Sequence, residues 1–248
     1  MISATSHDRH DTYDALVIAA HPDDAEAQMG GTLAKLADTG QRILLVDLTD
    51  GEPTEFADVG VRAAQAAEAA RILGVERVSL GLRDRLLTDT PEVRLEVAAL
   101  LRTHRPRWVF GTGEACVHPD HVAAAAITRA AVFLARLGQW DRAPGGERLA
   151  AQEPWIVDRL FFPHCKMEPP WGEFAFAVDV SAVYDRKRQA LAAYQSIFQA
   201  QGDRLLALYE AEDQYYGRMC GVAYAEIYRS AAPLLVDDPT VFRPAIHG

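Results

Sequence analysis

The stretch ALVIAA at residues 15–20 decides the fold class, because it is a short run in which every residue is apolar. A strand that is hydrophobic at every position is typical of a parallel sheet whose two faces are both covered. The next segment, 24–38, carries apolar residues at helical spacing and ends before Gly40, which predicts a helix. The chain therefore begins with a buried strand followed by a helix.

The same alternation continues along the chain. Three more strands are predicted at 42–48, 75–80 and 107–111. The helices that separate and follow them are predicted at 61–73, 91–103 and 122–137. Four strand–helix units in about 140 residues predict an α/β fold, Rossmann-like and doubly wound, with a mostly parallel sheet and helices on both faces.

The second half departs from this regular order. A loop at 143–154 is followed by two predicted strands, two helices and a last strand, at 155–162, 174–180, 182–200, 204–218 and 222–228. The Pro/Gly-containing loop is a possible domain boundary, but it is only about a dozen residues long, within the length of an ordinary connection. We expect a mobile tail at 1–12 and a single domain over 13–248.

Composition excludes several classes of protein. The 248 residues are 49% hydrophobic and 24% charged, which is ordinary for a globular chain. The net charge of -10 disfavours broad attraction to nucleic acid or to an anionic membrane. Three cysteines without a CxxC pair fit reduced thiols, and no run approaches the ~20 apolar residues of a spanning helix. We expect a cytoplasmic protein without nucleic-acid or membrane partners.

Two similar tetrapeptides stand out, HPDD at 21–24 and HPDH at 118–121. The first ends the first predicted strand, and the second follows the fourth. Ligands of doubly wound sheets bind at the carboxyl ends of such strands. Proline at the second position suits the start of a helix, where residues three apart can point the same way. Each tetrapeptide alone could be a simple helix start with an acidic residue near the dipole; two at one sheet edge favour a site.

The six side chains of this site are those of His21, Asp23, Asp24, His118, Asp120 and His121. Three imidazole or carboxylate ligands suit a catalytic zinc that keeps one position open. Zinc lowers the pKa of its water to around 7, and a nearby carboxylate can take the proton. A further histidine can then protonate the leaving group or stabilise the oxyanion.

The sequence resembles the LmbE-like (PIG-L) family of zinc-dependent N-deacetylases over residues 14 to 238. Besides HPDH, the matching stretches are AHPDD at 20–24, MGGTLA at 29–34, LTDGE at 48–52, ILGV at 72–75 and LGLRDR at 80–85. Near the end, GVAYAE at 221–226 with Pro233 and Leu234 resembles the bacillithiol-biosynthesis deacetylase branch. The resemblance implies an N-deacetylase with the fold predicted above.

The resemblance implies that His21, Asp24 and His121 hold the metal. Zinc is the expected ion, and Fe2+ is an alternative because imidazole and carboxylate suit both. Cys116 and His164 also lie where they could approach the site. A buried inert thiol is the alternative for Cys116, and a ligand role for His164 is disfavoured because the three-ligand set is already filled.

Catalytic and substrate-binding roles are implied in the same way. Asp23 would be the general base, His118 the acid or electrostatic partner, and Asp120 the residue that orients His118. The substrate-binding residues would be Arg62, Asp84 and Tyr194. A surface salt bridge, a turn residue and core packing, respectively, are the alternatives for these three. One departure from the family is Ala25 where many members have Glu, with Glu26 following.

These observations lead to one functional hypothesis and two alternatives. The hypothesis is a zinc hydrolase that removes the acetyl group from an N-acetylglucosamine-type amino sugar such as N-acetylglucosaminyl-malate. The resemblance also implies a homo-oligomer, a hexamer or a trimer. The first alternative is a deacylase of another N-acylated sugar or antibiotic. The second is a non-catalytic Rossmann-like ligand-binding domain, although no G-x-G-x-x-G follows the first strand.

Overall fold

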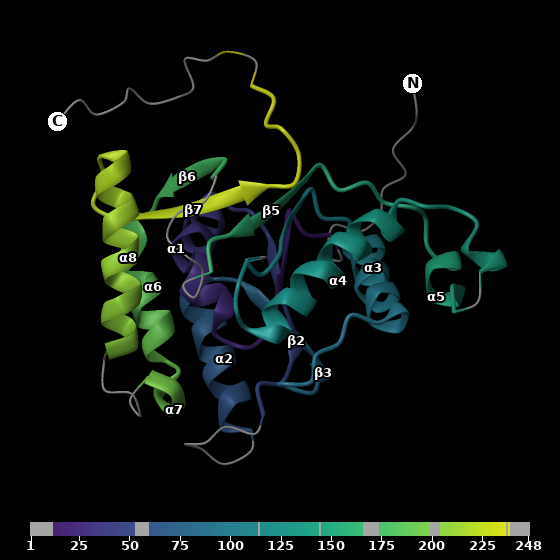
Figure 1. Cartoon of the computed structure of the whole chain (residues 1–248), viewed down its shortest axis with the longest axis horizontal. Helices are drawn as coiled ribbons and strands as arrows, with labels where there is room; N and C mark the ends of the chain where they lie inside the picture. The colour runs from purple at the N-terminus through teal and green to yellow at the C-terminus, as the bar shows by residue number, and fades with distance from the viewer. Residues whose placement is uncertain are drawn as a thin grey trace.

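A mixed sheet of seven strands runs through the part of the chain that the computed structural model describes (Figure 1). The described residues are 12–52, 60–113, 115–143, 145–165, 174–198, 204–236 and 238. The strand order is β3-β2-β1-β4-β5-β7-β6. The strands are β1 (Ala15–Ala19), β2 (Ile43–Thr49), β3 (Glu76–Leu82), β4 (Trp108–Phe110), β5 (Arg159–Pro163), β6 (Phe176–Asp179) and β7 (Ala225–Ser230). Residues 1–11 of the predicted tail lie outside the described residues.

Strand β1 lies at the centre of the parallel part of this sheet. It pairs in parallel with β2 on one side and β4 on the other, and all five of its residues are buried. Val17 belongs to one hydrophobic cluster, and its neighbours Leu16 and Ile18 belong to another. Successive side chains of a strand point to opposite faces, so an uninterrupted apolar run is what a sheet covered on both faces requires.

Helices cover both faces, as the sequence predicts. The first cluster is closed by α1 (Asp24–Asp38), α2 (Val61–Leu73) and α6 (Tyr184–Ala192). The second is closed by α3 (Pro91–His104) and α4 (Pro119–Ala135), which pack against each other. Figure 1 shows α3 and α4 on one side of the sheet and α6 on the other. The predicted doubly wound α/β fold is confirmed, with antiparallel pairing only where β7 joins β5 and β6.

The strand order reverses between β1 and β4, and this reversal positions the site. The chain runs from β1 outward to β2 and β3, then returns to β4 on the other side of β1 and continues to β5. The crossover helices on the two sides of this point therefore lie on opposite faces, which leaves a crevice at the carboxyl ends of β1 and β4. The loop considered as a domain boundary connects α4 to β5, and β5 pairs with β4 in the same sheet.

Two elements differ from their predicted bounds. The helix predicted at 182–200 is divided into a 3₁₀ turn (Ser181–Val183), α6 and a short α7 (Gln195–Phe198). The break falls at Tyr194, whose hydroxyl reaches the buried Glu26. Strand β5 begins at Arg159 rather than at 155, because only from Arg159 does the chain join the ladder with β4. Among the described residues, no helix is both long and apolar enough to cross a membrane.

Helix α1 is kinked just after its first turns. Met29 has non-helical dihedral angles (φ -149, ψ 20), and a second helical segment begins behind it. The carboxylate of Glu226 on β7 accepts hydrogen bonds from the backbone N–H groups of Gly31 (2.9 Å) and Thr32 (2.7 Å), as an N-cap does. A Cβ on Gly31 would lie 2.6 Å from a carbon of Val180, so glycine is required there.

A buried ion cluster holds this kink against α6 and α8 (Arg204–Cys220). The ammonium of Lys187 lies 2.7 Å from a carboxylate oxygen of Asp213 and 2.7 Å from one of Glu226, and all three side chains are fully buried. Charges removed from water are tolerated when each is paired in this way. The cluster therefore ties three C-terminal elements to the helix that follows HPDD.

Candidate active site

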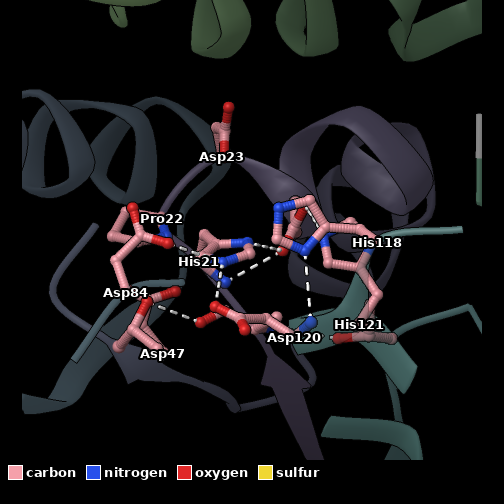
Figure 2. Close-up of polar contacts among 12 residues, drawn as sticks. His21, Pro22, Asp23, Asp47, Asp84, His118, Asp120 and His121 are labelled. Atoms are coloured by element: carbon pink, nitrogen blue, oxygen red, sulfur yellow. Dashed lines mark hydrogen bonds and ion pairs between the residues drawn. The ribbon is translucent and has the colours of Figure 1, made fainter. Parts of the chain in front are cut away.

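The structure brings the two tetrapeptides together at the carboxyl ends of β1 and β4 (Figure 2). The first lies between β1 and α1, and Pro119 of the second opens α4. The ring centroids of His21 and His121 are 5.2 Å apart, and His118 lies 4.8 Å from each. Residues almost a hundred positions apart in sequence thus form one cluster, because the order of strands reverses here.

The Asp24 carboxylate lies between two imidazoles. One oxygen is 3.2 Å from Nδ1 of His21, and the other is 3.0 Å from Nε2 of His121. Ligand atoms about 2.0–2.1 Å from a tetrahedral zinc lie about 3.3 Å from one another, so these three residues have the spacing and the chemistry of a metal-binding set. His118 also has a ring nitrogen within 4.8 Å of the other two imidazoles, which makes it a further candidate donor.

The other nitrogen of His21 is held by two carboxylates. Its Nε2 lies 3.0 Å from Asp84 and 3.1 Å from Asp120. Burial alone would lower the pKa of His21, but the hydrogen bonds with Asp24 and Asp84 outweigh it and raise the pKa to about 11. A carboxylate behind a metal-binding imidazole fixes its tautomer and orientation. Asp84, expected to contact substrate, and Asp120, expected to orient His118, both place their carboxylates on His21.

The backbone of the second tetrapeptide fixes the tautomer of His118. Its Nδ1 accepts a hydrogen bond from the backbone N–H of Asp120 at 3.2 Å, so the proton of the neutral ring is on Nε2. Burial, together with the positive charge of His121, lowers the pKa of His118. A neutral imidazole with its Nε2–H directed away from its own backbone is a hydrogen-bond donor for a developing oxyanion.

Asp23 sits on a strained turn and is set apart from the His21 carboxylate contacts. Its φ of 113 is in the left-handed region, which is costly for a residue with a Cβ and concentrates at functional sites. Figure 2 shows its side chain pointing away from Asp120. Burial raises the pKa of Asp23 to about 7, even though the charge of Arg62 opposes the shift. A carboxylate with a pKa near neutrality suits a general base.

Arg62 clamps this turn. Its guanidinium donates to the backbone oxygen of Pro22 and, at 3.0 Å, to a carboxylate oxygen of Asp23. The residue is 8% exposed and stands over the ring of Tyr194. Tyr194 is fully buried, which matches the core-packing alternative considered for it. The structure therefore places Arg62 against the catalytic turn and Tyr194 beneath Arg62.

Under this turn lies a polar network that the sequence analysis missed. The guanidinium of Arg77 contacts Glu26, both oxygens of Asp47 and the hydroxyl of Tyr194, which also donates to Glu26. Glu26 stands beside Ala25, the departure from the family pattern, and its carboxylate is directed inward to Arg77. A charged residue inside each of three predicted buried elements was the only sequence signal for this network.

Two thiols lie on the far side of His121. Its Nδ1 is 3.1 Å from the sulfur of Cys116 and 3.5 Å from that of Cys165. Burial alone would lower the pKa of His121, but the charge of Asp24 outweighs it and raises the pKa to about 10. His164 instead directs its Nε2 to Glu212, at 2.6 Å. Cys116 therefore reaches a site residue, and Cys165 was not singled out by the sequence analysis.

The fold and the site together define a hydrolase built at the switch point of a doubly wound sheet, with a metal-binding set beside a base and a neutral imidazole. The sequence pattern described as PIG-L: GlcNAc-PI de-N-acetylase matches residues 16–132. The chain belongs to this family, also called LmbE-like, and is an enzyme that hydrolyses amide bonds as an N-deacetylase.

Three similar proteins support the assignment. A diacetylchitobiose deacetylase of Thermococcus kodakarensis is 30% identical over 88% of this chain and 82% of its own. A 1D-myo-inositol 2-acetamido-2-deoxy-alpha-D-glucopyranoside deacetylase of Rhodococcus erythropolis is 27% identical over 72% of this chain and 79% of its own. The crystal structure of the conserved protein TT1542 from Thermus thermophilus is 40% identical, covers 91% of this chain and 97% of its own, and superposes with a TM-score of 0.79.

Proposed function

We propose that this N-deacetylase is metal-dependent and removes the acetyl group from an N-acetylglucosamine-type amino sugar. The observation that carries the proposal is the Asp24 carboxylate held between His21 and His121, with Asp23 and His118 beside them. This arrangement has a metal-binding set, a base and a donor within one cluster. The similarity to two sugar deacetylases supports the substrate class.

The metal is proposed to be zinc, with Fe2+ as the alternative, on His21, Asp24 and His121. When bound, such an ion lowers the pKa of a coordinated water and polarises the amide carbonyl. Imidazole and carboxylate donors suit both ions, so the donor set does not choose between them. Asp84 and Asp120 hold His21 from behind and so orient one ligand.

The remaining side chains move the protons. Asp23 takes a proton from the attacking water, whose oxygen adds to the carbonyl carbon of the acetamide. His118 donates a hydrogen bond through Nε2–H to the carbonyl oxygen as it becomes negative. The C–N bond then breaks, the sugar amine leaves with a proton delivered by the site, and acetate remains. Arg62 contributes by holding the Pro22–Asp23 turn, which fixes the position of the base.

The group attached to the sugar is a finer proposal. The two named relatives act, by their names, on N-acetylglucosamine units joined to a second sugar or to inositol. We propose a substrate of this kind, with N-acetylglucosaminyl-malate as a candidate from the resemblance to the bacillithiol branch. A deacylase of another N-acylated sugar or antibiotic remains the alternative. Family membership as an enzyme disfavours a non-catalytic ligand-binding domain.

Acetate release tests the proposal directly. The protein is stripped with a chelator, reloaded with zinc or with Fe2+ under anaerobic conditions, and assayed on four N-acetyl sugars. These are N,N'-diacetylchitobiose, the N-acetylglucosaminyl conjugates of inositol and malate, and free N-acetylglucosamine. We expect release that depends on the added metal and is fastest on one conjugate. Equal release by the stripped protein contradicts the metal, and no release from any sugar by loaded protein contradicts the substrate class.

The cytoplasmic location and the homo-oligomer, a hexamer or a trimer, also stay proposals. Helix α8 presents large apolar side chains of Leu208, Tyr215 and Met219, each more than half exposed. Their spacing of seven and four residues puts them on one face of the helix. A contiguous exposed apolar face is typical of a subunit contact. Light scattering coupled to size-exclusion chromatography measures the assembly, and a monomer at micromolar concentration contradicts it.

A further inference from the structure

Two buried cysteines from distant parts of the chain meet behind the proposed metal ligand His121. Cys116 lies between β4 and α4, and Cys165 follows β5. The two residues are 6% and 2% exposed, and their sulfur atoms are only 2.8 Å apart. A disulfide bond has a sulfur–sulfur distance of about 2.0 Å, so less than 1 Å separates this contact from a covalent bond.

The surroundings of the Cys116 sulfur make it the nucleophile of the pair. It accepts a hydrogen bond from the thiol of Cys165 and one from the backbone N–H of His118 at 3.4 Å. Nδ1 of His121 lies at 3.1 Å, and its other nitrogen faces Asp24, so Nδ1–H also points to this sulfur. Three donors around one sulfur favour the thiolate, which is the reactive form of cysteine.

We propose that Cys116 and Cys165 are a redox-active pair that closes reversibly to a disulfide and, in closing, weakens His121 as a metal ligand. The covalent step stands on the sulfur contact alone. Its effect on the metal rests on the proposed function, because that function makes His121 a ligand.

The oxidant is a hydroperoxide, and the electrons balance. The Cys116 thiolate attacks one oxygen of hydrogen peroxide, which forms a sulfenic acid and releases hydroxide that is protonated to water. The Cys165 sulfur then attacks the sulfenic sulfur, the S–S bond forms, and the second oxygen leaves as water. Two thiols lose two electrons and one peroxide is reduced to two waters. A dithiol reverses the reaction by exchange through a mixed disulfide.

The link to the metal is the hydrogen bond at Nδ1 of His121. A disulfide sulfur carries no negative charge, so closure removes the acceptor that orients this imidazole. Loss of such a partner behind a metal ligand typically lowers metal affinity or activity about 10–100-fold. Closure also pulls on Cys116, which lies two residues before His118 and three before the start of α4. The helix that carries both histidines is therefore attached directly to the redox pair.

The chain supplies its own control in Cys220, an exposed cysteine at the end of α8. The zinc-loaded wild type, Cys165→Ser and Cys220→Ser are treated with hydrogen peroxide and digested without reduction for mass spectrometry. Serine at 165 keeps a hydroxyl donor beside Cys116 but cannot form the bond. Zinc is used because it has no redox chemistry of its own.

We expect the wild type and Cys220→Ser to yield a peptide pair linked through Cys116 and Cys165, about 2 Da lighter than the two thiols because two hydrogens are lost. Zinc affinity, measured by chelator competition, should fall about 10–100-fold and recover with dithiothreitol. Cys165→Ser should form no linked pair and show no recovery by dithiothreitol. The redox pair is overturned if peroxide takes Cys116 to sulfinic acid without a link, or if two zinc ions bind per chain and one is lost in Cys165→Ser. A linked pair with unchanged zinc affinity overturns the effect on the metal while leaving the proposed deacetylase intact.

Discussion

Two clusters of charged side chains lie inside this molecule, and they are built in opposite ways. Around Lys187, one cation meets two carboxylates at 2.7 Å, and all three side chains are closed off from solvent. Around His21, carboxylates outnumber what the fold needs, and Asp24 faces two imidazoles at the spacing of metal ligands. The first cluster is complete in itself and serves stability. The second is complete only with a further positive charge, which is the property of a binding site.

The largest expected effect is the loss of turnover in Asp23→Ala. Proton transfer by a positioned base contributes about 10²–10⁴-fold to rate, so kcat should fall by that factor. Metal content and thermal midpoint should stay as in the wild type, because Asp23 is outside the proposed ligand set. Acetate release and elemental analysis of the same samples measure both. Unchanged turnover would remove Asp23 from the base role, and lost metal would make it a ligand.

The second prediction breaks the closed cluster. In Lys187→Met, Asp213 and Glu226 are left buried without their counter-charge, which typically costs about 3–5 kcal/mol of unfolding free energy. Urea unfolding measures the loss. Metal affinity at low temperature should remain close to that of the wild type, since Lys187 is not among the site residues. A variant that keeps its stability but loses metal would show that the two clusters are coupled through α1.

The two clusters also differ in how far sequence can predict them. His21 with Asp24, and His118 with His121, are three residues apart at helix starts, and both pairs follow strands of one parallel sheet. A local spacing and one rule about strand ends were therefore enough to predict that these residues meet. The continuous apolar run of β1 was likewise enough to predict a sheet covered on both faces.

The closed cluster depends on contacts that no local pattern encodes. Glu226 caps the second half of α1 from 195 residues away, and Cys165 meets Cys116 across 49 residues. The break between α6 and α7 falls within residues of good helix propensity, at Tyr194, which is drawn to Glu26 and Arg77. Here a tertiary contact overrides the local preference, so sequence reasoning extended the helix too far.

A third prediction separates the two roles considered for Tyr194. Tyr194→Phe removes a hydroxyl that is 2.9 Å from both Glu26 and Arg77. Hydrogen bonds to charged groups contribute about 1.5–3 kcal/mol, so the free energy of unfolding should fall by that amount. KM for the sugar should stay within about twofold if the hydroxyl serves only this buried network. A large rise in KM with unchanged stability would instead support a substrate contact.

The fourth prediction concerns Asp84, whose carboxylate holds Nε2 of His21. Removing a carboxylate behind a metal ligand lowers metal affinity about 10–100-fold, and this is the expected result for Asp84→Ala. At saturating metal, KM should change little. Chelator competition gives the affinity, and steady-state kinetics at high metal gives KM. Normal affinity with a raised KM would return Asp84 to the role of a substrate-binding residue.

The smallest effect is expected where a charged pair is neither closed nor open to a ligand. Asp38 forms two hydrogen bonds with Arg186, at 2.8 and 2.7 Å, but both side chains are solvated. The ordered pair holds the pKa of Asp38 below its usual value. Water and salt screen such pairs, so Asp38→Ala should leave the thermal midpoint and the metal affinity unchanged. A midpoint shift comparable to that of Lys187→Met would mean that ion pairing between α1 and α6 matters more for stability than burial, and the distinction between the two clusters would then rest on geometry alone.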